Sequence, residues 1–388
     1  MIHLFINALS ASAGGGLTYV RNVLPRLACR DGVRTTLLVG EALRSEIAGS
    51  TQVEVLREAY PDASGRRFWY EQCYLPNLIG RSGADVLLST GNFALFVSPV
   101  PQILLSRNAL YISADFVRDM RDRGDYRLWI DTAVKSAFAR WSVRVADCTV
   151  APSAAFAKEL RQWTGKEVES IHHGFDQKAF CWQTAPLPED VQIRLAATEG
   201  AIRVLFVSHY NYYRNFETLI RAIAILKKNV YPRPVRLVLT CKLASKDNPG
   251  IYQADKAAGL VRELKLSEEV VELGAVPYAA LHHLYRSCDV YATPAYAETF
   301  AHPLVEAMAS GLPVVASDLA VHREICGDAA IYFPRFAAEI LAERIAQICE
   351  SDEQKSTMRE MGMARSRAFS WDKHVDQLLL LAQRLAAK

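Results

Sequence analysis

Two glutamates with a defined spacing are the residues of this chain best suited to chemistry. Glu298 and Glu306 stand eight positions apart, and Pro303 between them suits the first turn of a helix, where its missing amide would be unpaired anyway. The backbone amides that open a helix bind anions. One carboxylate just outside that turn and another one turn inside can accept hydrogen bonds from hydroxyls around a bound phosphate. The pattern predicts a phosphorylated, polyhydroxylated ligand such as a sugar nucleotide.

A glycine cluster after the first apolar run is a second candidate site. Gly14, Gly15 and Gly16 precede a helix that is predicted from about residue 17, and glycines there let the backbone approach an oxyanion or a sugar closely. A nicotinamide-binding fingerprint needs the spacing G-x-G-x-x-G, which the residues after Gly16 do not supply. Glu41, beside the end of the second predicted strand, leaves a nicotinamide-dependent oxidoreductase open as an alternative.

Apolar runs and amphipathic segments alternate along both halves of the chain, which predicts mostly parallel sheets with helices on both faces. In the first half, strands are expected at 2–6, 35–39, 53–56, 86–89, 102–106 and 148–151. In the second half, they are expected at 203–208, 235–240, 270–273, 290–293, 314–316 and 331–333. The two glutamates follow the strand at 290–293, and ligands of such sheets bind at the carboxyl ends of the strands.

A chain of 388 residues exceeds one ordinary core, so two α/β domains are expected. Residues 180–200 contain Pro186 and Pro188 among charged residues and are the predicted linker. The N-terminal domain is expected at residues 1–182, completed by a C-terminal amphipathic helix within 371–388. The C-terminal domain is expected at residues 200–370.

Composition excludes several classes of protein. The chain is 51% hydrophobic and 22% charged, as globular proteins are, and a net charge of +3 without a basic run argues against a nucleic-acid partner. The eight cysteines are scattered without a CxxC pair, so we expect reduced thiols in a cytoplasmic setting and no metal site. The first residues lack the basic segment of a signal peptide, and glycines and prolines interrupt the longest uncharged stretch, 86–106, so no membrane span is expected.

The chain resembles the retaining glycosyltransferases of the GT-B fold, specifically glycosyltransferase family 4. The E-x7-E block that begins at Glu298 carries most of this resemblance, and it is specific as a unit. Residues 205–223 resemble the family's phosphate-binding turn, and residues 171–180 resemble the turn before its linker. The resemblance covers essentially the whole chain. It implies an α/β fold of two doubly wound, Rossmann-like domains facing a cleft, with the C-terminal helix returning to the N-terminal domain.

The resemblance also implies roles for the donor-side residues. Glu306 would accept hydrogen bonds from the ribose hydroxyls of a nucleotide, and Glu298 would contact the transferred sugar. The residues between them would offer backbone amides to sugar and phosphate: Thr299, Phe300, Ala301, His302 and Pro303. Family members often have glycine at the positions of Thr299 and Ala301, so this chain departs from the pattern there, which would narrow the choice of donor.

Three basic side chains would face the diphosphate. Arg214 matches the family's phosphate-binding lysine, and an arginine can bridge two phosphate oxygens. His209 stands where the family has an arginine, which is a departure that removes a full charge. Lys242 follows the strand at 235–240 and is a further candidate for the diphosphate.

On the acceptor side, the resemblance points to Gly14, Gly15 and Gly16. Many family members have a histidine in the N-terminal domain that points into the cleft, and this chain offers Arg107 and Asn108 at the corresponding turn. These two residues would contact the donor hexose or the acceptor, or Asn108 would simply form the turn.

Two stretches rich in aromatic and basic residues, 66–70 and 116–141, predict peripheral contact with an anionic membrane near a lipid-linked acceptor. Aspartates interleave with the arginines of the second stretch, so a solvated, salt-bridged face is the alternative.

The sequence therefore predicts hexosyl transfer from a GDP- or UDP-linked sugar to a saccharide or lipid-linked hydroxyl, with retention, in surface polysaccharide or lipopolysaccharide biosynthesis. No cofactor and no metal are expected, because no Asp-x-Asp suits a metal diphosphate site. The protein would be cytoplasmic, at the inner face of the membrane if it binds one. A nicotinamide-dependent oxidoreductase and an inactive nucleotide-sugar-binding subunit remain the alternatives.

Overall fold

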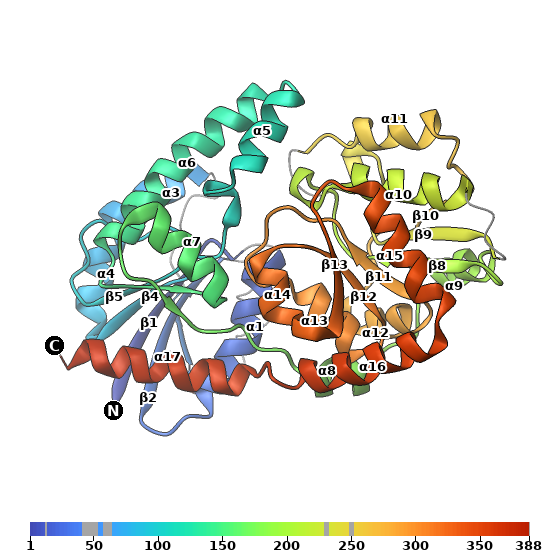
Figure 1. Cartoon of the computed structure of the whole chain (residues 1–388). Helices are drawn as coiled ribbons and strands as arrows, with labels where there is room; N and C mark the ends of the chain where they lie inside the picture. Colours follow the sequence, from blue (N-terminus) through green and yellow to red (C-terminus); the bar gives the residue numbers. More distant parts are fainter. Residues whose placement is uncertain (12–13, 41–52, 57–63, 229–232, 248–251, 388) are drawn as a thin grey trace. The chain divides into compact units, whose positions relative to one another are not determined.

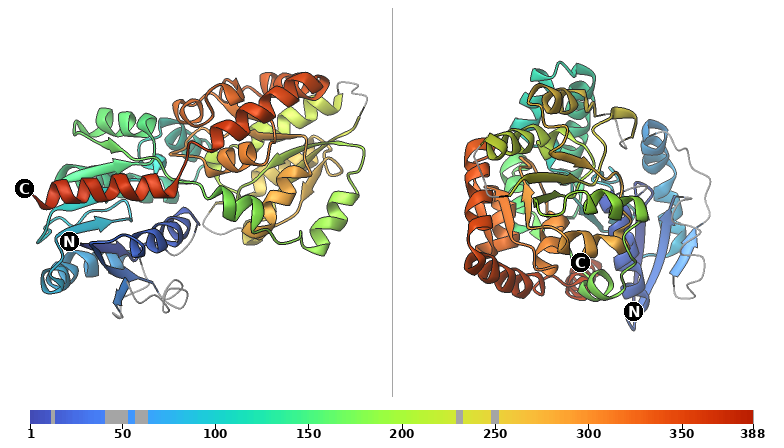
Figure 2. Two further views of the ribbon diagram at one scale, coloured as in Figure 1. Left: turned by 90° about the horizontal axis from the view of Figure 1, so that it is seen from below. Right: turned by 90° about the vertical axis from the view of Figure 1, so that its right-hand side faces the viewer.

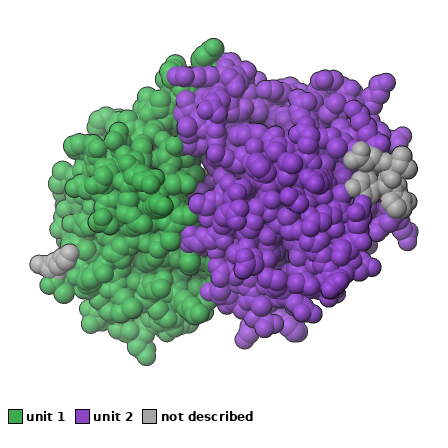
Figure 3. All heavy atoms as spheres, in the orientation of Figure 1, with its two compact units in different colours: residues 1–112, 126–174, 369–388 green, residues 113–125, 175–368 purple. Residues whose placement is uncertain are grey.

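The computed structural model divides the chain into two compact units, coloured separately in Figure 3. Unit 1 comprises residues 1–112, 126–174 and 369–388, and unit 2 comprises residues 113–125 and 175–368. The structure describes residues 1–11, 14–40, 53–56, 64–228, 233–247 and 252–387. Glu41, which bears on the nicotinamide alternative, lies outside the described residues.

Unit 1 is built on a seven-stranded parallel sheet (Figure 1). Its strands, in their order across the sheet, are β3 (Val53–Leu56), β2 (Val33–Val39), β1 (Ile2–Ala8), β4 (Val86–Ser89), β5 (Gln102–Leu105), β6 (Cys148–Ala151) and β7 (Glu169–Ser170). All seven residues of β1 are buried, as expected of a central parallel strand that is covered on both faces.

Helices cover this sheet. They are α1 (Gly14–Ala28), α3 (Ser64–Cys73), α4 (Leu75–Ser82), the 3₁₀ turn η1 (Ala109–Tyr111), α6 (Tyr126–Val145), α7 (Ala154–Thr164) and α17 (Trp371–Ala386). Helix α17 lies beside α1 and β1, and its apolar residues join the core that β1 forms (Figures 1 and 2). Gly174 is required here, because a side chain at this position would collide with the backbone of Trp371.

Unit 2 is built on a six-stranded parallel sheet. Its strands, in order, are β10 (Val270–Glu272), β9 (Val235–Leu239), β8 (Ile202–Phe206), β11 (Val290–Thr293), β12 (Val314–Ser317) and β13 (Ala330–Phe333). Its α-helices are α5 (Ala114–Asp122), α8 (Gln177–Trp182), α9 (Glu189–Ala196), α10 (Phe216–Lys228), α11 (Asp255–Glu263), α12 (Tyr278–Arg286), α13 (His302–Ala309), α14 (Ala320–Cys326), α15 (Ala338–Glu350) and α16 (Asp352–Ser366). Its 3₁₀ turns are η2 (Tyr212–Arg214), η3 (Ser245–Asp247) and η4 (Gly327–Ala329).

The predicted linker, 180–200, is not a loop throughout. It contains α9, which begins after Pro188, carries Glu189 in its first turn and buries Val191 and Leu195 on one face. Proline and acidic residues before an i, i+4 apolar pair are a helix start, which the composition of the segment obscured.

Two further differences concern helix boundaries. The glycine cluster is not a loop before α1, because the helix begins at Gly14 itself. The aromatic and basic stretch at 116–141 spans two helices that belong to different units: α5 to unit 2 and α6 to unit 1. Local composition does not predict this separation, since both helices carry basic residues together with aspartate.

Candidate functional site

An ion pair joins two of the predicted site residues in unit 2. Arg214, at the end of the loop after β8, donates from Nη1 to Oε2 of Glu298 at 2.5 Å, and their side chains are 17% and 11% exposed. The second carboxylate oxygen of Glu298 accepts the Thr299 amide at 3.0 Å. Burial alone would raise the pKa of Glu298, but Arg214 and this amide hold it below its usual range. Glu298 is therefore a fixed carboxylate at neutral pH.

Glu306 has a different environment. It lies within α13, is 6% exposed, and accepts a hydrogen bond from the Tyr285 hydroxyl at 2.9 Å. Burial raises the pKa of Glu306 to about 7, although the Tyr285 hydroxyl opposes the shift. No salt bridge compensates the carboxylate within the described part of the chain, so the empty protein holds this group between its two protonation states near neutral pH.

The buried ring of Tyr291, in β11, links the two glutamates. Burial raises the pKa of its hydroxyl, and the charges of Arg214, Glu306 and Glu298 act on it as well. Its ring centroid lies 5.8 Å from that of Tyr285, which binds Glu306. Arg214 and Glu298 follow the carboxyl ends of β8 and β11, where parallel sheets bind ligands, and the charge of Glu306 acts on the same Tyr291 ring as theirs.

The start of α13 lies between the two glutamates in sequence. Pro303 is in its first turn, and the N-cap residue, Ala301, has no side chain that could cap the helix. Ala301 adopts φ 64°, a left-handed conformation that L-residues other than glycine, asparagine and aspartate rarely take. The ring of Phe300 is buried and lies 4.8 Å from that of His302. This backbone turn is therefore held by its surroundings against a conformational cost.

The other two basic candidates have different surroundings. His209 is exposed, and its carbonyl oxygen accepts from Ser208 and Asn211. Lys242 donates from Nζ to the carbonyl oxygen of Glu272 at 2.7 Å, which ties it to the end of β10. Arg214 is thus the basic candidate whose ion pair with a predicted carboxylate, Glu298, is established.

In unit 1, Arg107 holds the glycine turn. Its guanidinium donates to the carbonyl oxygens of Gly15 at 2.9 Å and Thr90 at 2.7 Å and lies 5.1 Å from the centroid of the Tyr19 ring. Burial lowers the pKa of Arg107 to about 10. Asn108 caps η1 by accepting the Leu110 amide at 3.0 Å, so it forms a turn as the simpler alternative expected. Gly16 contacts the backbone of Ala11 closely, which leaves little space for a side chain there.

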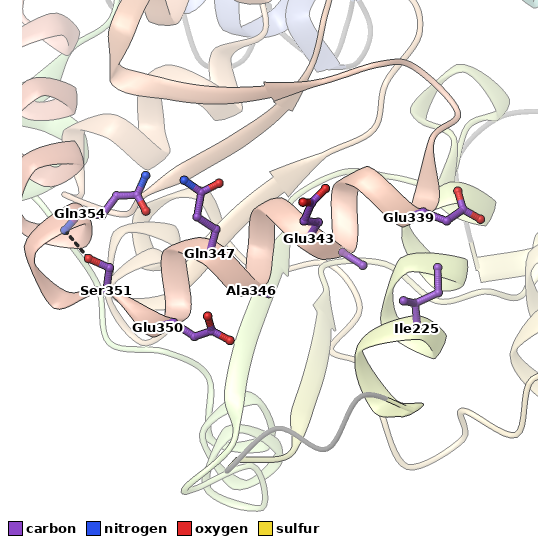
Figure 4. Close-up of a pocket in the computed structure, with 9 residues that line it drawn as sticks. Ile225, Glu339, Glu343, Ala346, Gln347, Glu350, Ser351 and Gln354 are labelled. Carbon is purple, nitrogen blue, oxygen red and sulfur yellow. Dashed lines mark hydrogen bonds between the residues drawn. The ribbon is translucent and has the colours of Figure 1, made fainter.

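Three hollows on unit 2 lie away from Tyr291. A groove of about 510 Å³ between α10 and α15 is lined by Glu339, Glu343 and Glu350 (Figure 4). A second, of about 680 Å³, lies beside Thr184, His283 and Arg286. The third, of about 580 Å³, is lined by α5, α10 and α11 and reaches Asn215, next to Arg214. An acidic groove alone identifies no ligand, and only the third of these hollows adjoins a predicted site residue.

The described ranges contain neither a metal-binding cluster nor a membrane-spanning helix. No three His, Cys, Asp or Glu side chains in them are grouped so as to hold a metal ion. No helix in them combines the length and apolar character needed to cross a bilayer.

Comparison with known proteins points in one direction. Residues 189–365 match the family model described as "Glycosyl transferases group 1", which is somewhat less than half of the chain. D-inositol 3-phosphate glycosyltransferase of Corynebacterium aurimucosum is 31% identical over 180 residues, 45% of this chain and 41% of that protein. O-antigen chain mannosyltransferase B of Escherichia coli is 30% identical over 107 residues, 28% of each chain. The chain thus spans less than half the length of these curated relatives.

Solved structures show the same fold over the full length. Sucrose-phosphate synthase from Thermosynechococcus elongatus matches with a TM-score of 0.76 and 19% identity, covering 100% of both chains. Anabaena Alr3699/HepE in complex with UDP matches with a TM-score of 0.70 and 20% identity, covering 99% of this chain and 100% of that one. With its two parallel α/β domains, the chain has the GT-B fold that the sequence predicted.

Sequence reasoning missed the tyrosines that surround the glutamates. Tyr285 lies in α12 and Tyr291 in β11, and the apolar pattern of both segments predicts ordinary core residues at these positions. It also missed His322, which is fully buried and donates from Nδ1 to the carbonyl oxygen of Ser317 at 2.8 Å. The charge of Glu298 acts on this ring as well. No sequence signal separates these side chains from core aromatics.

Proposed function

We propose that this protein is a retaining glycosyltransferase that moves a hexosyl group from a GDP- or UDP-linked sugar to a hydroxyl of a saccharide or lipid-linked acceptor. One observation carries the proposal: Arg214, Glu298 and Glu306 gather around Tyr291, beside the uncapped start of α13. These residues lie within the stretch that matches the glycosyl transferases group 1 model. The names of the relatives and the UDP bound by the Anabaena protein support the same reading.

The donor would be held by the two glutamates in different ways. Glu306, as a carboxylate, would accept hydrogen bonds from the two ribose hydroxyls, and charge-assisted bonds of this kind are stronger than neutral ones. Glu298 would contact the transferred sugar, with Thr299, Phe300, Ala301 and His302 offering backbone contacts. The amides opening α13 near Pro303 and the guanidinium of Arg214 would bind the diphosphate. Lys242 and His209 are weaker candidates for the same phosphates.

In the proposed reaction, the bond between the anomeric carbon and the diphosphate oxygen breaks, and the anomeric carbon bonds to the acceptor oxygen on the same face. The acceptor hydroxyl proton passes to the leaving phosphate oxygen. Arg214 and the α13 amides stabilise the charge that grows on the diphosphate, the kind of preorganised effect that lowers many barriers most. Glu298 is not proposed as a nucleophile, because it is ion-paired with Arg214 at 2.5 Å.

No metal is proposed to take part. Activity that persists after chelation agrees with this proposal, and strict dependence on Mn²⁺ contradicts it. The acceptor is proposed to bind in unit 1 near Gly14, Gly15 and Gly16, with Arg107 fixing that turn and Asn108 beside it. An Escherichia coli relative named as an O-antigen chain mannosyltransferase supports a role in surface polysaccharide or lipopolysaccharide synthesis.

A thermal-shift panel of GDP, UDP, ADP and dTDP sugars tests this function. A ligand that binds the native state raises its melting temperature by mass action, by an amount set by its concentration relative to Kd. We expect the sugars of one nucleotide, for example UDP or GDP, to raise Tm. Without acceptor, we expect slow hydrolysis of that nucleotide sugar. A shift with NADH alone would favour the oxidoreductase, and a nucleotide-sugar shift without any turnover would favour the inactive binding subunit.

Peripheral contact with a bilayer is also proposed, through an exposed apolar stripe on unit 1. Helix α6 presents Tyr126, Ile130, Val134, Phe138 and Trp141 at intervals of three and four residues, each at least 40% exposed. Trp69 of α3 is 66% exposed, and its neighbour Phe68 packs 5.1 Å from Phe138.

The charges around this stripe favour an anionic lipid surface as its occupant. Arg66, Arg127 and Arg140 lie exposed on the same two helices. The arginines of α5 belong to unit 2, where Arg123 is buried in ion pairs with Asp119 and Glu217. An interfacial helix combines such an apolar face with flanking cations. The enzyme would then act at the inner face of the cytoplasmic membrane.

Vesicle flotation tests this surface. We expect binding to phosphatidylglycerol vesicles at low salt, weak binding to phosphatidylcholine vesicles, and loss of binding in Ile130→Ser/Val134→Ser. The matched control is Leu380→Ser, which changes an equally exposed leucine on α17. Equal binding by the stripe variant and the control would contradict the proposal.

A further inference from the structure

Helix α5 belongs to unit 2, although the chain before it and the chain after it both belong to unit 1. Residues 113–125 belong to unit 2, although residues 1–112 and 126–174 on both sides belong to unit 1 (Figure 3). Ser113 caps the helix by accepting the Phe116 amide at 3.2 Å. Phe116 and Met120 are fully buried, so one face of α5 contributes to the core of unit 2.

The last turn of α5 carries a cluster of charges that is not on the surface. Arg123 donates from Nε to Oδ1 of Asp119 at 2.7 Å and from Nη1 to Oε1 of Glu217 at 2.9 Å. The side chains are 9% exposed for Arg123, 18% for Asp119 and 13% for Glu217. Exposed ion pairs do little to fix the positions of their side chains, whereas buried charges with several hydrogen bonds are costly to rearrange. The three charged residues therefore fix the positions of the neighbouring side chains that they contact.

Asp119 reaches the loop that carries Glu298. Its second oxygen, Oδ2, accepts the Tyr296 hydroxyl at 2.7 Å, and Tyr296 precedes Glu298 by two residues. The backbone amide of Tyr296 also donates to the carbonyl oxygen of Tyr213, next to Arg214, at 3.0 Å. Asp119 thus holds one of the two loops whose side chains form the Arg214–Glu298 ion pair.

Arg123 reaches the other loop, which carries Arg214. Its guanidinium carbon lies 4.2 Å from the centroid of the Tyr212 ring, in the turn that ends at Arg214. Glu217, which Arg123 binds, also accepts the Tyr210 hydroxyl at 3.1 Å. The ring of Phe116 lies 6.5 Å from that of Tyr213 in an edge-on contact. The residues of α5 therefore contact the turn before Arg214 on two sides.

We propose that Asp119 and Arg123 are positioning residues for the donor site: through Tyr296 and the Tyr210–Tyr213 turn they set the relative placement of Glu298 and Arg214. This inference rests on the glycosyltransferase function proposed above. Neither residue contacts substrate in this role. Catalytic groups must be held within fractions of an ångström of the productive geometry, which requires supporting contacts of this kind. The segment that runs from the acceptor-side turn at Arg107 into α5 thereby supports the donor site.

The consequence differs for binding and for turnover. Glu306 lies on α13 and binds the Tyr285 hydroxyl of α12, so nucleoside binding through the ribose should depend little on the cluster. The placement of Glu298 and Arg214 on sugar and diphosphate does. Loosening the cluster should lower kcat more than it weakens binding of a nucleoside monophosphate.

A double-mutant cycle on Asp119 and Tyr296 tests the inference. The variants are Asp119→Asn, Tyr296→Phe and the double variant, with Arg123→Lys as a variant that keeps the charge. The matched control is Asp352→Asn, which removes the charge of an aspartate paired with Lys355 at 2.9 Å on the surface of unit 2. The measurements are donor hydrolysis (kcat and KM), the Kd of UMP or GMP, and the melting temperature.

We expect Asp119→Asn and Tyr296→Phe each to lower kcat by about 10-fold or more while Kd for the monophosphate changes by less than about threefold. The double variant should be no slower than the slower single variant, because both break one hydrogen bond. Arg123→Lys should retain more activity than Asp119→Asn. The control should match the unmodified protein.

Three results would overturn the inference while leaving the proposed function intact. They are kcat within twofold in both single variants that fold, additive losses in the double variant, and an equal loss of kcat and monophosphate affinity. Tyr296→Phe keeps the test decisive if Asp119→Asn fails to fold, since it removes only one hydroxyl. Absence of turnover in the unmodified protein with every nucleotide sugar would instead contradict the proposed function, and this inference with it.

Discussion

Arg107 of unit 1 and Arg214 of unit 2 occupy similar places but bind different partners. Each follows a strand of its parallel sheet, each lies about 5 Å from the centroid of a tyrosine ring, and each has a buried Nε without a partner among the described residues. Arg107 donates to two backbone carbonyls, and Arg214 donates to the Glu298 carboxylate. Burial lowers the pKa of Arg107 to about 10. Burial also acts to lower the pKa of Arg214, but Glu298, Tyr213 and Tyr291 together raise it above its usual range.

On the proposed function, this difference distinguishes a cation that holds the fold from one that takes part in the reaction. Two carbonyl oxygens accept hydrogen bonds from the Nη atoms of Arg107 but do not neutralise its charge, so its bonds hold a turn in place. Arg214 is neutralised by Glu298, which is itself a candidate ligand of the sugar. A bound nucleotide sugar could therefore contact both Arg214 and Glu298. We therefore expect changes at Arg107 to affect stability and changes at Arg214 to affect chemistry.

The largest expected effect is that of Arg214→Met on turnover. Loss of a preorganised donor to a developing oxyanion typically costs about 10² to 10³ in kcat, and the change also leaves Glu298 buried without its cation. Steady-state donor turnover measures this effect. A kcat within threefold of the unmodified protein would remove the distinction between the two arginines.

The next prediction concerns pH and sharpens the contrast within unit 2, between Glu298 and Glu306. Ribose hydroxyls require the carboxylate form of Glu306, whose pKa burial raises to about 7. We expect the Kd of UDP or GDP to be constant above about pH 8 and to rise roughly tenfold per unit as pH falls below 7. Titrations between pH 5.5 and 8.5, those limits being about a unit and a half from the pKa, measure it. A flat profile would contradict the assignment.

The same pKa shift predicts the stability of the empty protein. A carboxyl whose pKa is raised in the folded state from 4.5 to about 7 binds a proton that the unfolded chain has lost over that interval. The free energy of unfolding therefore falls as pH rises from about 4.5 to 7 and levels off above, with a contribution of at most about 3 kcal/mol from this group. Urea unfolding of the protein and of Glu306→Gln isolates the contribution, which should be absent in the variant.

Arg107→Met should act on stability with a smaller effect. It removes two hydrogen bonds to carbonyls that then lack their donor, which should lower the free energy of unfolding by about 1 to 3 kcal/mol. Chemical denaturation measures this loss. The Kd of the nucleoside diphosphate, which binds in unit 2, should stay within about twofold, and a larger change would show that the two arginines are not separable.

The smallest effect is expected at Ala301. Glycine removes the cost of the left-handed backbone, about 1 kcal/mol, but it also makes the unfolded chain more flexible by a similar amount. Ala301→Gly should leave the melting temperature nearly unchanged and widen the range of sugar nucleotides that raise it. An unchanged donor range would mean that the turn does not restrict the donor.

The sequence predicted the architecture well where the local pattern decides the structure. The strands at 53–56 and 290–293 match the structure to the residue, because short apolar runs between turn residues have one stable arrangement in a parallel sheet. Ser153 caps α7 as its residue type predicts, by accepting the Phe156 amide at 3.2 Å. The spacing of Glu298 and Glu306 likewise identified two residues whose charges both act on the Tyr291 hydroxyl.

What the sequence did not predict depends on contacts between distant segments. The bond from Tyr285 to Glu306 joins two helices, and the raised pKa of Glu306 follows from burial that no local pattern records. The membership of α5 in unit 2 depends on Asp119 and Arg123 finding Glu217 and Tyr296, about 90 and 180 residues away. Similar charges in α6 are solvated, so composition could not tell the two helices apart.

The most direct test of the account is a calorimetric titration of UDP and GDP into the protein and into Glu306→Gln at pH 8. We expect one of the two nucleotides to bind the unmodified protein, and its affinity to fall by about 10- to 100-fold in the variant, as loss of charge-assisted bonds to two hydroxyls implies. The variant should at the same time unfold at a higher temperature, because a buried charge has been removed. Equal affinity in the two proteins, or no binding of either nucleotide, would contradict the account.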